Sequence, residues 1–281
     1  MSTTKPIGEP LAFGWYFVDL LHDDGSRFTV AVHGANGFAL PRRASVVVWH
    51  YRDGAKPKMW VAPGGGPQLP AHSMLCGMRN DIADISPTGT GWQLHVDSPR
   101  FSLDLRIEQQ VALWRPAGLP YPLRLEADSG SFDWVVACPL GRAEGRFSAG
   151  DLQFALSGDA YVDVNFGSLD LAAELDWWKW STIELARNDR VVVSTTKWRR
   201  APAVSGAIRV TPAGVQELGP EQLGRSIGVD LGPLALDTPT PPALPLASEL
   251  DLSVLGGRLG LYRRWSGRLG GTPAVLALLQ A

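Results

Sequence analysis

Apolar and polar residues alternate in short segments along most of this 281-residue chain, and helical spacing of apolar residues is nearly absent. Successive side chains of a strand point to opposite faces, so the alternation predicts strands. Such segments recur roughly every 8–12 residues with turn signals between them, a pattern typical of all-β sandwiches and barrels. The length allows one large β domain or two of ordinary size.

Hairpins are the clearest predicted elements, and Asp24-Gly25 is the strongest turn signal among them. The predicted hairpins cover residues 13–34, 92–107 and 180–197. Further strands are expected at 45–52, 132–138, 145–147, 152–157, 206–211, 227–236, 250–254 and 258–265. At the end of the sequence, Pro273–Ala281 predicts a short helix with proline in its first turn.

The densest set of candidate site residues lies within 158–184. Tyr161, Asp163 and Asn165 alternate with apolar residues, so a strand would place them in one row with an apolar row behind. Trp177-Trp178-Lys179-Trp180 follows, and tryptophans carry large apolar areas. If the two segments pair, the polar row faces an aromatic wall, which is the usual setting of a site. The alternatives are a row that faces water, or side chains that fix a turn before Gly167.

Composition excludes several classes of protein. The formal net charge is −2 and no basic block occurs, so nucleic acid is not an expected partner. Cys76 and Cys138 are too few for a disulfide framework. Residues 1–12 lack a signal-peptide core and no apolar run is long enough for a membrane span, so we expect a cytoplasmic protein. Eleven tryptophans indicate an aromatic-lined space or simply a tryptophan-rich core.

No metal or cofactor motif is present in the sequence. The five histidines are scattered without ligand spacing, and no dinucleotide fingerprint or G-x-S-x-G occurs. We therefore expect no metal and no cofactor. Any enzyme here should act through acid–base groups, through the shape of its pocket, or through both.

Two stretches carry a resemblance to a known family. GDAYVDVNFG followed by WWKW resembles the G-x-x-Y-x-D-x-N-x-G plus Trp-x-Trp signature of the carotenoid 1,2-hydratase-like family, and FGWYFVDLLHDDG resembles its opening hairpin. The resemblance implies two lipocalin-like (calycin) β domains, which we expect at residues 1–157 and 158–281. The family includes carotenoid hydratases and lipocalin-like natural-product cyclases, among them Diels–Alderases. Val164 stands where hydratases often have histidine, which argues against carotenoid hydration itself.

Asp163 is the best candidate acid, because burial raises the pKa of a carboxyl group and keeps it protonated. The resemblance implies an active role for Tyr161 and Asp163, and Asn165 on the same face could orient water or a substrate oxygen. Glu184, on the strand face of Trp178 and Trp180, is a weaker second acid. The candidate substrate-binding residues are Trp15, Tyr16, His33, Trp49, Trp178, Trp180 and Trp198.

The sequence favours a cofactor-independent enzyme that cyclises or hydrates a hydrophobic, unsaturated natural product, such as a polyene, a terpenoid or a polyketide-derived molecule. The enzyme would combine templating in an aromatic pocket with an acid or hydrogen-bond donor. The alternatives are a non-catalytic lipid- or pigment-binding lipocalin and a true carotenoid 1,2-hydratase. The expected partner is a hydrophobic small molecule, and the chain is expected to be a monomer or a homodimer.

Overall fold

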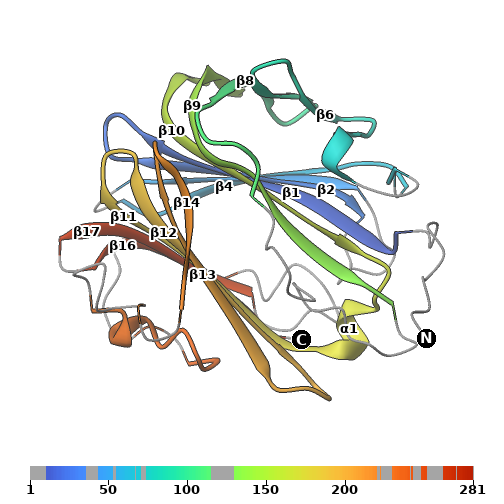
Figure 1. The fold of residues 1–281 in the computed structure, drawn as a ribbon. Helices are drawn as coiled ribbons and strands as arrows, with labels where there is room; N and C mark the ends of the chain where they lie inside the picture. The colour runs from blue at the N-terminus through green and yellow to red at the C-terminus, as the bar shows by residue number, and fades with distance from the viewer. Residues whose placement is uncertain are drawn as a thin grey trace.

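The computed structural model contains two antiparallel β-sheets and almost no helix (Figure 1). Figure 1 shows the first sheet, coloured blue to green, above the second, coloured yellow to red. No helix among the described residues is long and apolar enough to cross a membrane. The structure describes residues 11–35, 44–52, 55–66, 68–70, 74–114, 130–219, 222, 230–240, 242, 248–251, 262–269 and 271–280.

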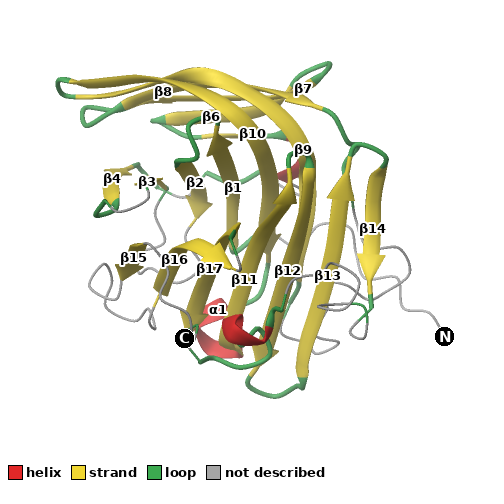
Figure 2. Ribbon diagram, turned by 90° about the vertical axis from the view of Figure 1, so that its left-hand side faces the viewer, coloured by secondary structure: helices red, strands yellow, loops and turns green. Residues whose placement is uncertain are grey.

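The first sheet has ten strands among the described residues, in the order β4-β3-β2-β1-β10-β9-β8-β7-β6-β5, and it curls over on itself (Figure 2). Its strands are β1 (Phe13–His22), β2 (Arg27–Ala35), β3 (Ser45–Tyr51), β4 (Lys58–Pro63), β5 (Met78–Arg79), β6 (Ala83–Pro87), β7 (Gly91–Asp97), β8 (Ser102–Gln109), β9 (Phe132–Ala149) and β10 (Leu152–Gly167). A 3₁₀ turn, η1 (Met74–Cys76), precedes β5.

The second sheet has seven strands among the described residues, in the order β14-β13-β12-β11-β17-β16-β15. Its strands are β11 (Leu175–Ala186), β12 (Asp189–Trp198), β13 (Ala203–Thr211), β14 (Gly214–Leu218), β15 (Ser248–Asp251), β16 (Tyr262–Leu269) and β17 (Thr272–Gln280). A 3₁₀ turn, η2 (Gly232–Leu234), lies between β14 and β15 in the chain. The two sheets confirm the predicted fold of two lipocalin-like β domains.

The chain passes from the first sheet to the second through a single short helical turn, α1 (Leu171–Glu174). The Asp170 side chain caps this turn by accepting hydrogen bonds from the backbone N–H groups of Ala172 and Ala173. The domain boundary expected between residues 157 and 158 falls inside β10, whereas the change of sheet comes after Gly167.

Alternation along β1 and β10 separates two hydrophobic cores. The two strands pair over their full length, with Phe17 opposite Asp163 and Asp19 opposite Tyr161. Residues such as Val18 and Val162 point into the curl of the first sheet and form its core. The other row of each strand faces the second sheet, where Tyr161 joins a second core between the sheets. The polar row of β10 is therefore enclosed between the two domains.

The two glycines that flank this polar row are required for close packing. A Cβ atom at Gly158 would lie 2.1 Å from the carbonyl oxygen of Leu21 on β1, and one at Gly167 would lie 1.9 Å from that of Ser131. Any side chain at these positions would push the neighbouring backbone away. The glycines of the GDAYVDVNFG motif thus hold β10 tightly between β1 and the start of β9.

Several predicted elements differ from the structure. Residues 132–147 were expected as two short strands, but β9 is one strand of 18 residues that continues past Gly141. The predicted helix Pro273–Ala281 is wrong, because residues 272–280 form β17 in the middle of the second sheet. Of the strand predicted at 227–236, residues 227–229 lie outside the described residues and 230–236 contain η2 instead. The three predicted hairpins are confirmed.

Candidate active site between the two sheets

Three polar side chains on β10 form a hydrogen-bonded unit in the core between the sheets. The Tyr161 hydroxyl donates to Oδ2 of Asp163 at 2.9 Å, and Nδ2 of Asn165 donates to Oδ1 at 2.9 Å. All three residues are at most 1% exposed. The side chains therefore neither face water nor fix a turn before Gly167, which excludes the two structural alternatives that the sequence left open. We call Tyr161, Asp163 and Asn165 the β10 triad.

Burial dominates the acidity of this unit. It raises the pKa of Asp163 from 3.8 to about 7, although hydrogen bonds from Trp134, Tyr161 and Asn165 favour the carboxylate and act in the opposite direction. Burial also raises the pKa of Tyr161 well above its ordinary value. At neutral pH, Asp163 is therefore poised between acid and base while Tyr161 stays protonated.

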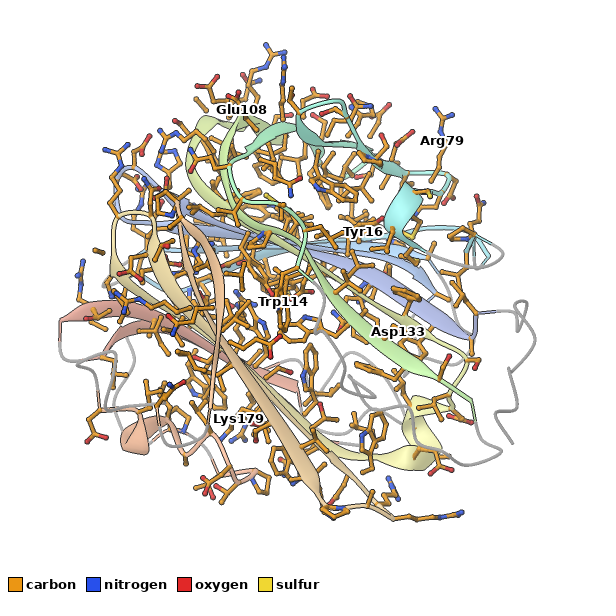
Figure 3. All side chains as sticks on the ribbon, in the orientation of Figure 1. Tyr16, Arg79, Glu108, Trp114, Asp133 and Lys179 are labelled. Carbon is orange, nitrogen blue, oxygen red and sulfur yellow. The ribbon has the colours of Figure 1, made fainter. Side chains whose placement is uncertain are left out.

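Aromatic rings surround the β10 triad on the side of the second sheet. The ring of Trp180 on β11 lies 5.7 Å from that of Tyr161 and 4.9 Å from that of Phe17 on β1. On the other side of Asp163, Trp134 of β9 packs edge-on against Trp114, which Figure 3 labels near the middle of the molecule. The polar row therefore lies next to aromatic rings, although β10 and β11 belong to different sheets and do not pair.

A layer of buried charge lies beside the triad. Asp19 of β1 pairs with Arg27 of β2 and accepts hydrogen bonds from Thr29 at 2.8 Å and from Arg264 of β16 at 3.1 Å. Burial alone would raise the pKa of Asp19, but the charges of Arg27 and Arg264 hold it below its ordinary value. Asp19 is therefore an anion at neutral pH, and its pairing with Arg264 links the two sheets.

Glu184 belongs to the same layer, and both of its carboxylate oxygens lie close to arginine side chains. Its Oε1 lies 3.5 Å from Nη2 of Arg27, and its Oε2 lies 3.2 Å from Nε of Arg190 on β12. Arg190 is 1% exposed and Glu184 is 5% exposed. Both oxygens of Glu184 therefore face guanidinium groups, which makes it a charge partner of Arg27 and Arg190. We call Asp19, Arg27, Glu184, Arg190 and Arg264 the charge layer.

Aromatic faces enclose the Arg264 guanidinium. Its central carbon lies 5.0 Å from the ring centre of Phe17, 5.6 Å from that of Tyr51 and 5.7 Å from that of Trp49. The Trp180 ring is 6.0 Å away on the side of the triad. Cation–π attraction compensates part of the cost of burying this charge.

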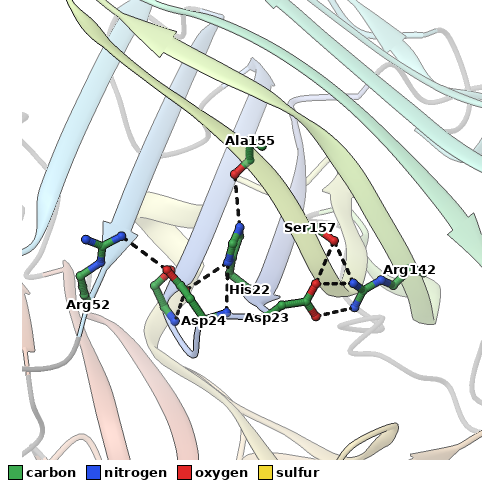
Figure 4. Close-up of polar contacts among 8 residues, drawn as sticks. His22, Asp23, Asp24, Arg52, Arg142, Ala155 and Ser157 are labelled. Carbon is green, nitrogen blue, oxygen red and sulfur yellow. Dashed lines mark hydrogen bonds and ion pairs between the residues drawn. The ribbon is translucent and has the colours of Figure 1, made fainter.

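A cleft of about 460 Å³ opens at one end of the two sheets, where several turns meet. Arg27, Tyr51 and Glu184 form part of its wall, so the charge layer is reached from here, whereas the β10 triad is not part of the wall. Figure 4 shows the contacts of two lining residues: His22 faces the Ala155 carbonyl oxygen, and Asp23 is bound by Arg142. The remaining lining residues are Leu21, Gly25, Arg52, Asp159, Leu185, Ala186, Arg187, Ser266, Gly267, Arg268, Gly271, Thr272, Pro273 and Ala274.

The structure brings most of the predicted site residues to the space between the sheets. Trp15 lies 6.3 Å from Trp178 and 6.0 Å from the half-buried His33, ring centre to ring centre. Burial lowers the pKa of His33 to about 4, so its imidazole is neutral at physiological pH. Trp198 packs edge-on against Phe132 in the same core.

Tyr16 is the predicted site residue that the structure places elsewhere. It belongs to the opposite row of β1, inside the curl of the first sheet, and its hydroxyl donates to the carbonyl oxygen of Met74. Figure 3 labels it away from the space between the sheets. Tyr16 and Trp15 lie on opposite faces of β1, so the two side chains cannot line the same space.

The arginines of the charge layer were missed by sequence reasoning. Arg27 begins β2 and Arg190 is the second residue of β12, each directly after a turn, and Arg264 lies in the middle of β16. A charged residue at an inward position of an alternating strand was the available signal. Within the described residues, no group of three or more His, Cys, Asp or Glu side chains could hold a metal ion.

Comparison with solved structures shows the fold. A protein assigned as AttH from Nitrosomonas europaea matches with a TM-score of 0.57 and 14% identity, over 99% of this chain and 96% of that one. CghA, solved with Sch210972, matches with a TM-score of 0.54 and 10% identity, over 95% and 88%. The sequence matches no described protein family and no curated protein. The chain thus has the same lipocalin-like fold as these two proteins, as its motifs predicted.

Proposed function

We propose that this protein is a cofactor-independent enzyme that cyclises or hydrates a hydrophobic, unsaturated small molecule, with Asp163 as its acid. The observation that carries the proposal is a buried carboxyl group with a pKa of about 7 in a wall of tryptophans. A structural carboxylate would gain nothing from such a position, whereas an acid working at neutral pH requires it. CghA shares the fold and was solved with the small molecule Sch210972, which supports a small-molecule ligand.

The proposed reaction begins with proton transfer from the Asp163 carboxyl group to a substrate alkene. The new C–H bond leaves a carbocation, which the faces of Trp180 and Trp134 stabilise. In hydration, water adds its oxygen to the cation and returns its extra proton to the Asp163 carboxylate. In cyclisation, a second alkene attacks the cation and the ring then loses a proton to the same carboxylate. Asp163 is restored in both cases.

Tyr161 and Asn165 position this acid. Each donates a hydrogen bond to a different oxygen of Asp163, so the carboxyl plane is fixed. The Oδ1 atom of Asn165 is buried and has no hydrogen-bond partner among the described residues. It is therefore available to accept a hydrogen bond from water or from a substrate hydroxyl group.

The proposal is tested by incubating the protein with an acyclic isoprenoid polyene in D₂O. Proton transfer from Asp163 should add one carbon-bound deuterium to each product, which mass spectrometry detects. Asp163→Asn should lower turnover by about 10²–10⁴-fold, since an amide cannot supply the proton. The control is Glu108→Gln on the exposed side of β8, which should keep full turnover.

Two results would contradict this mechanism. A ring product that contains no deuterium would indicate a pericyclic reaction, in which the fold acts as a template and Asp163 only donates a hydrogen bond. Recovery of the polyene unchanged and still bound would favour the second candidate, a non-catalytic binding lipocalin. One observation supports that candidate, because the wall of the 460 Å³ cleft does not include the β10 triad.

A further inference from the structure

We propose that the amide oxygen of Asn165 accepts a hydrogen bond from a hydroxyl group of the substrate, so that the ligand is an unsaturated alcohol and not a pure hydrocarbon. The inference rests on the proposed function, because it names the polar group that the substrate presents beside Asp163. It is carried by a buried acceptor without a partner and by the tryptophans that flank it.

The amide of Asn165 has one half in use and one half free. Its Nδ2 donates to Oδ1 of Asp163 at 2.9 Å, while Tyr161 occupies the other oxygen of that carboxyl group. Asn165 is 0% exposed, and its Oδ1 has no hydrogen-bond partner among the described residues. Turning the amide over would take the donor away from Asp163, so the free atom is the oxygen. A buried acceptor is costly to leave unpaired, and a donor from a bound molecule is therefore expected there.

Tryptophans flank Asn165 on both sides within the first sheet. It lies directly opposite Trp15 on β1 and Trp134 on β9, and opposite residues of paired strands share a face. Both tryptophans are at most 6% exposed. From the second sheet, the ring of Trp178 lies 6.3 Å from that of Trp15. An amide oxygen between indole rings suits a hydrophobic ligand that carries one hydrogen-bond donor.

The rings next to Trp15 mark the side from which a ligand can reach this oxygen. Trp178 and His33 are half-buried, whereas Trp15 and Asn165 are buried behind them. The ring centres of Trp178 and His33 lie 6.3 and 6.0 Å from that of Trp15. The wall of the 460 Å³ cleft contains none of these four residues. The approach to Asn165 is therefore separate from that cleft and lies along the Trp15 ring.

The charges near the triad favour a neutral donor over an ammonium group. The Arg264 guanidinium lies 6.0 Å from the Trp180 ring, which in turn lies 5.7 Å from the Tyr161 ring. A second cation close to it would be buried beside a like charge. His33 is neutral at physiological pH because burial lowers its pKa to about 4, so it adds no anion to offset one. A hydroxyl group supplies the donor without the charge.

The test compares geraniol with its methyl ether by isothermal titration calorimetry. The ether keeps the chain and both double bonds but cannot donate a hydrogen bond. Geraniol should bind the wild-type protein roughly tenfold more tightly, the value of one hydrogen bond to a buried acceptor. Equal affinities would show that Asn165 is served by a buried water molecule only, which overturns the proposal without any variant. Tighter binding of geranylamine than of geraniol would replace the hydroxyl group by a cation and overturn it as well.

Variants then locate the acceptor. Asn165→Leu has a similar volume and no acceptor, so it should bind the alcohol and the ether equally. Asn165→Asp keeps an oxygen at this position and should keep the preference for the alcohol, which provides a second variant if leucine disturbs the fold. The matched control is Gln153→Leu, which removes an exposed amide from the same strand. A preference for geraniol that persists in Asn165→Leu would place the hydroxyl group elsewhere and overturn the assignment.

Binding and catalysis fail separately in this design. Asp163→Asn should still prefer geraniol, because the side-chain oxygen of the new residue can accept from Asn165 and hold its amide in place. A clear preference for the alcohol without turnover of any polyene would leave the hydroxyl site standing and reject the acid role of Asp163. Turnover with deuterium in the product, but without a preference for the alcohol, would do the opposite.

Discussion

At the scale of single residues, Asp163 differs from the other buried carboxylates in what surrounds it. Asp19 and Glu184 both face arginines. Asp163 has only neutral donors, so burial decides its pKa. The core therefore contains carboxyl groups paired with arginines and one carboxyl group, Asp163, whose pKa lies near neutral pH.

The ionisation of Asp163 should appear in the stability of the protein. Its pKa is about 7 in the folded chain and near 3.8 in the unfolded chain, so between these values the folded state holds more protons. The free energy of unfolding should then fall as pH rises across this range, by up to roughly 4 kcal/mol from this group. Asp163→Asn removes that dependence. Urea denaturation at several pH values, followed by tryptophan fluorescence, measures the difference between the two proteins, and parallel curves would contradict the assignment.

The acid role gives a second pH prediction. A general acid must be protonated, so turnover by the wild type should decrease as pH rises through about 7. A general base would show the opposite dependence on pH. Turnover of the polyene measured between about pH 5 and pH 9, with stability checked at each point, separates the two roles.

At the scale of elements, strands with clear alternation and a turn signal were predicted well, whereas a continuous apolar strand was not. The hairpin of β1 and β2 carries alternation and a turn signal, and both are visible in the sequence. β17 reads PAVLALLQ, a continuous apolar run of good helix formers, because it lies between β11 and β16 with both faces covered. Periodicity cannot separate such a strand from a buried helix. β9 was divided because Gly141 resembles a turn signal, although the strand continues through it.

The close contact at the end of β10 makes Gly167 a stability determinant. Gly167→Ala should lower the free energy of unfolding by about 1–3 kcal/mol, the usual cost of overpacking, because Cβ would overlap the Ser131 carbonyl oxygen. Gly66→Ala is the control, since nothing lies within 4 Å of a Cβ atom there. Chemical denaturation of both variants tests this, and equal stability would show that β9 and β10 can separate without cost.

The outer face of the second sheet contains a buried ammonium group. Nζ of Lys179 donates to the carbonyl oxygens of Leu234, Ala235 and Thr240 at 3.2, 2.5 and 2.7 Å, and burial lowers its pKa to about 8. Lys179→Met should leave these three acceptors unpaired and release residues 231–240 from the sheet. Hydrogen exchange should then be faster in that segment alone. Lys197→Met, which removes a lysine bound to one carbonyl oxygen, is the matched control.

At the scale of the whole molecule, the sequence could predict the β10 triad but not the charge layer. Tyr161, Asp163 and Asn165 lie on one strand, where a period of two settles which side chains share a face. Arg27, Arg190 and Arg264 come from three strands in two sheets, and only the packing of one sheet on the other brings them together. The pattern of residues along the chain does not show how close these three arginines lie in the folded protein.

The Asp19–Arg264 pair should couple the unfolding of the two sheets. Arg264→Met leaves Asp19 with one cation fewer in a buried position and should cost about 3–5 kcal/mol, the range for a broken buried pair. Because this contact joins β1 to β16, the variant should unfold in two steps where the wild type unfolds in one. Differential scanning calorimetry distinguishes these outcomes, and a single transition shifted to lower temperature would show that the sheets are coupled by other contacts.

The Asp19–Arg264 pair also affects the order in which the chain folds during its synthesis. Asp19 and Arg264 are separated by 245 positions, and β17, which follows Arg264, completes the middle of the second sheet. During synthesis, Glu184 of β11 can reach Arg27 early, but Asp19 receives its second cation, Arg264, only when the ribosome has delivered β16. Contacts this distant in sequence form late and slowly. A nascent chain stalled before residue 262 should therefore hold a formed first sheet that chaperones still bind, and release from them should coincide with the arrival of the late strands.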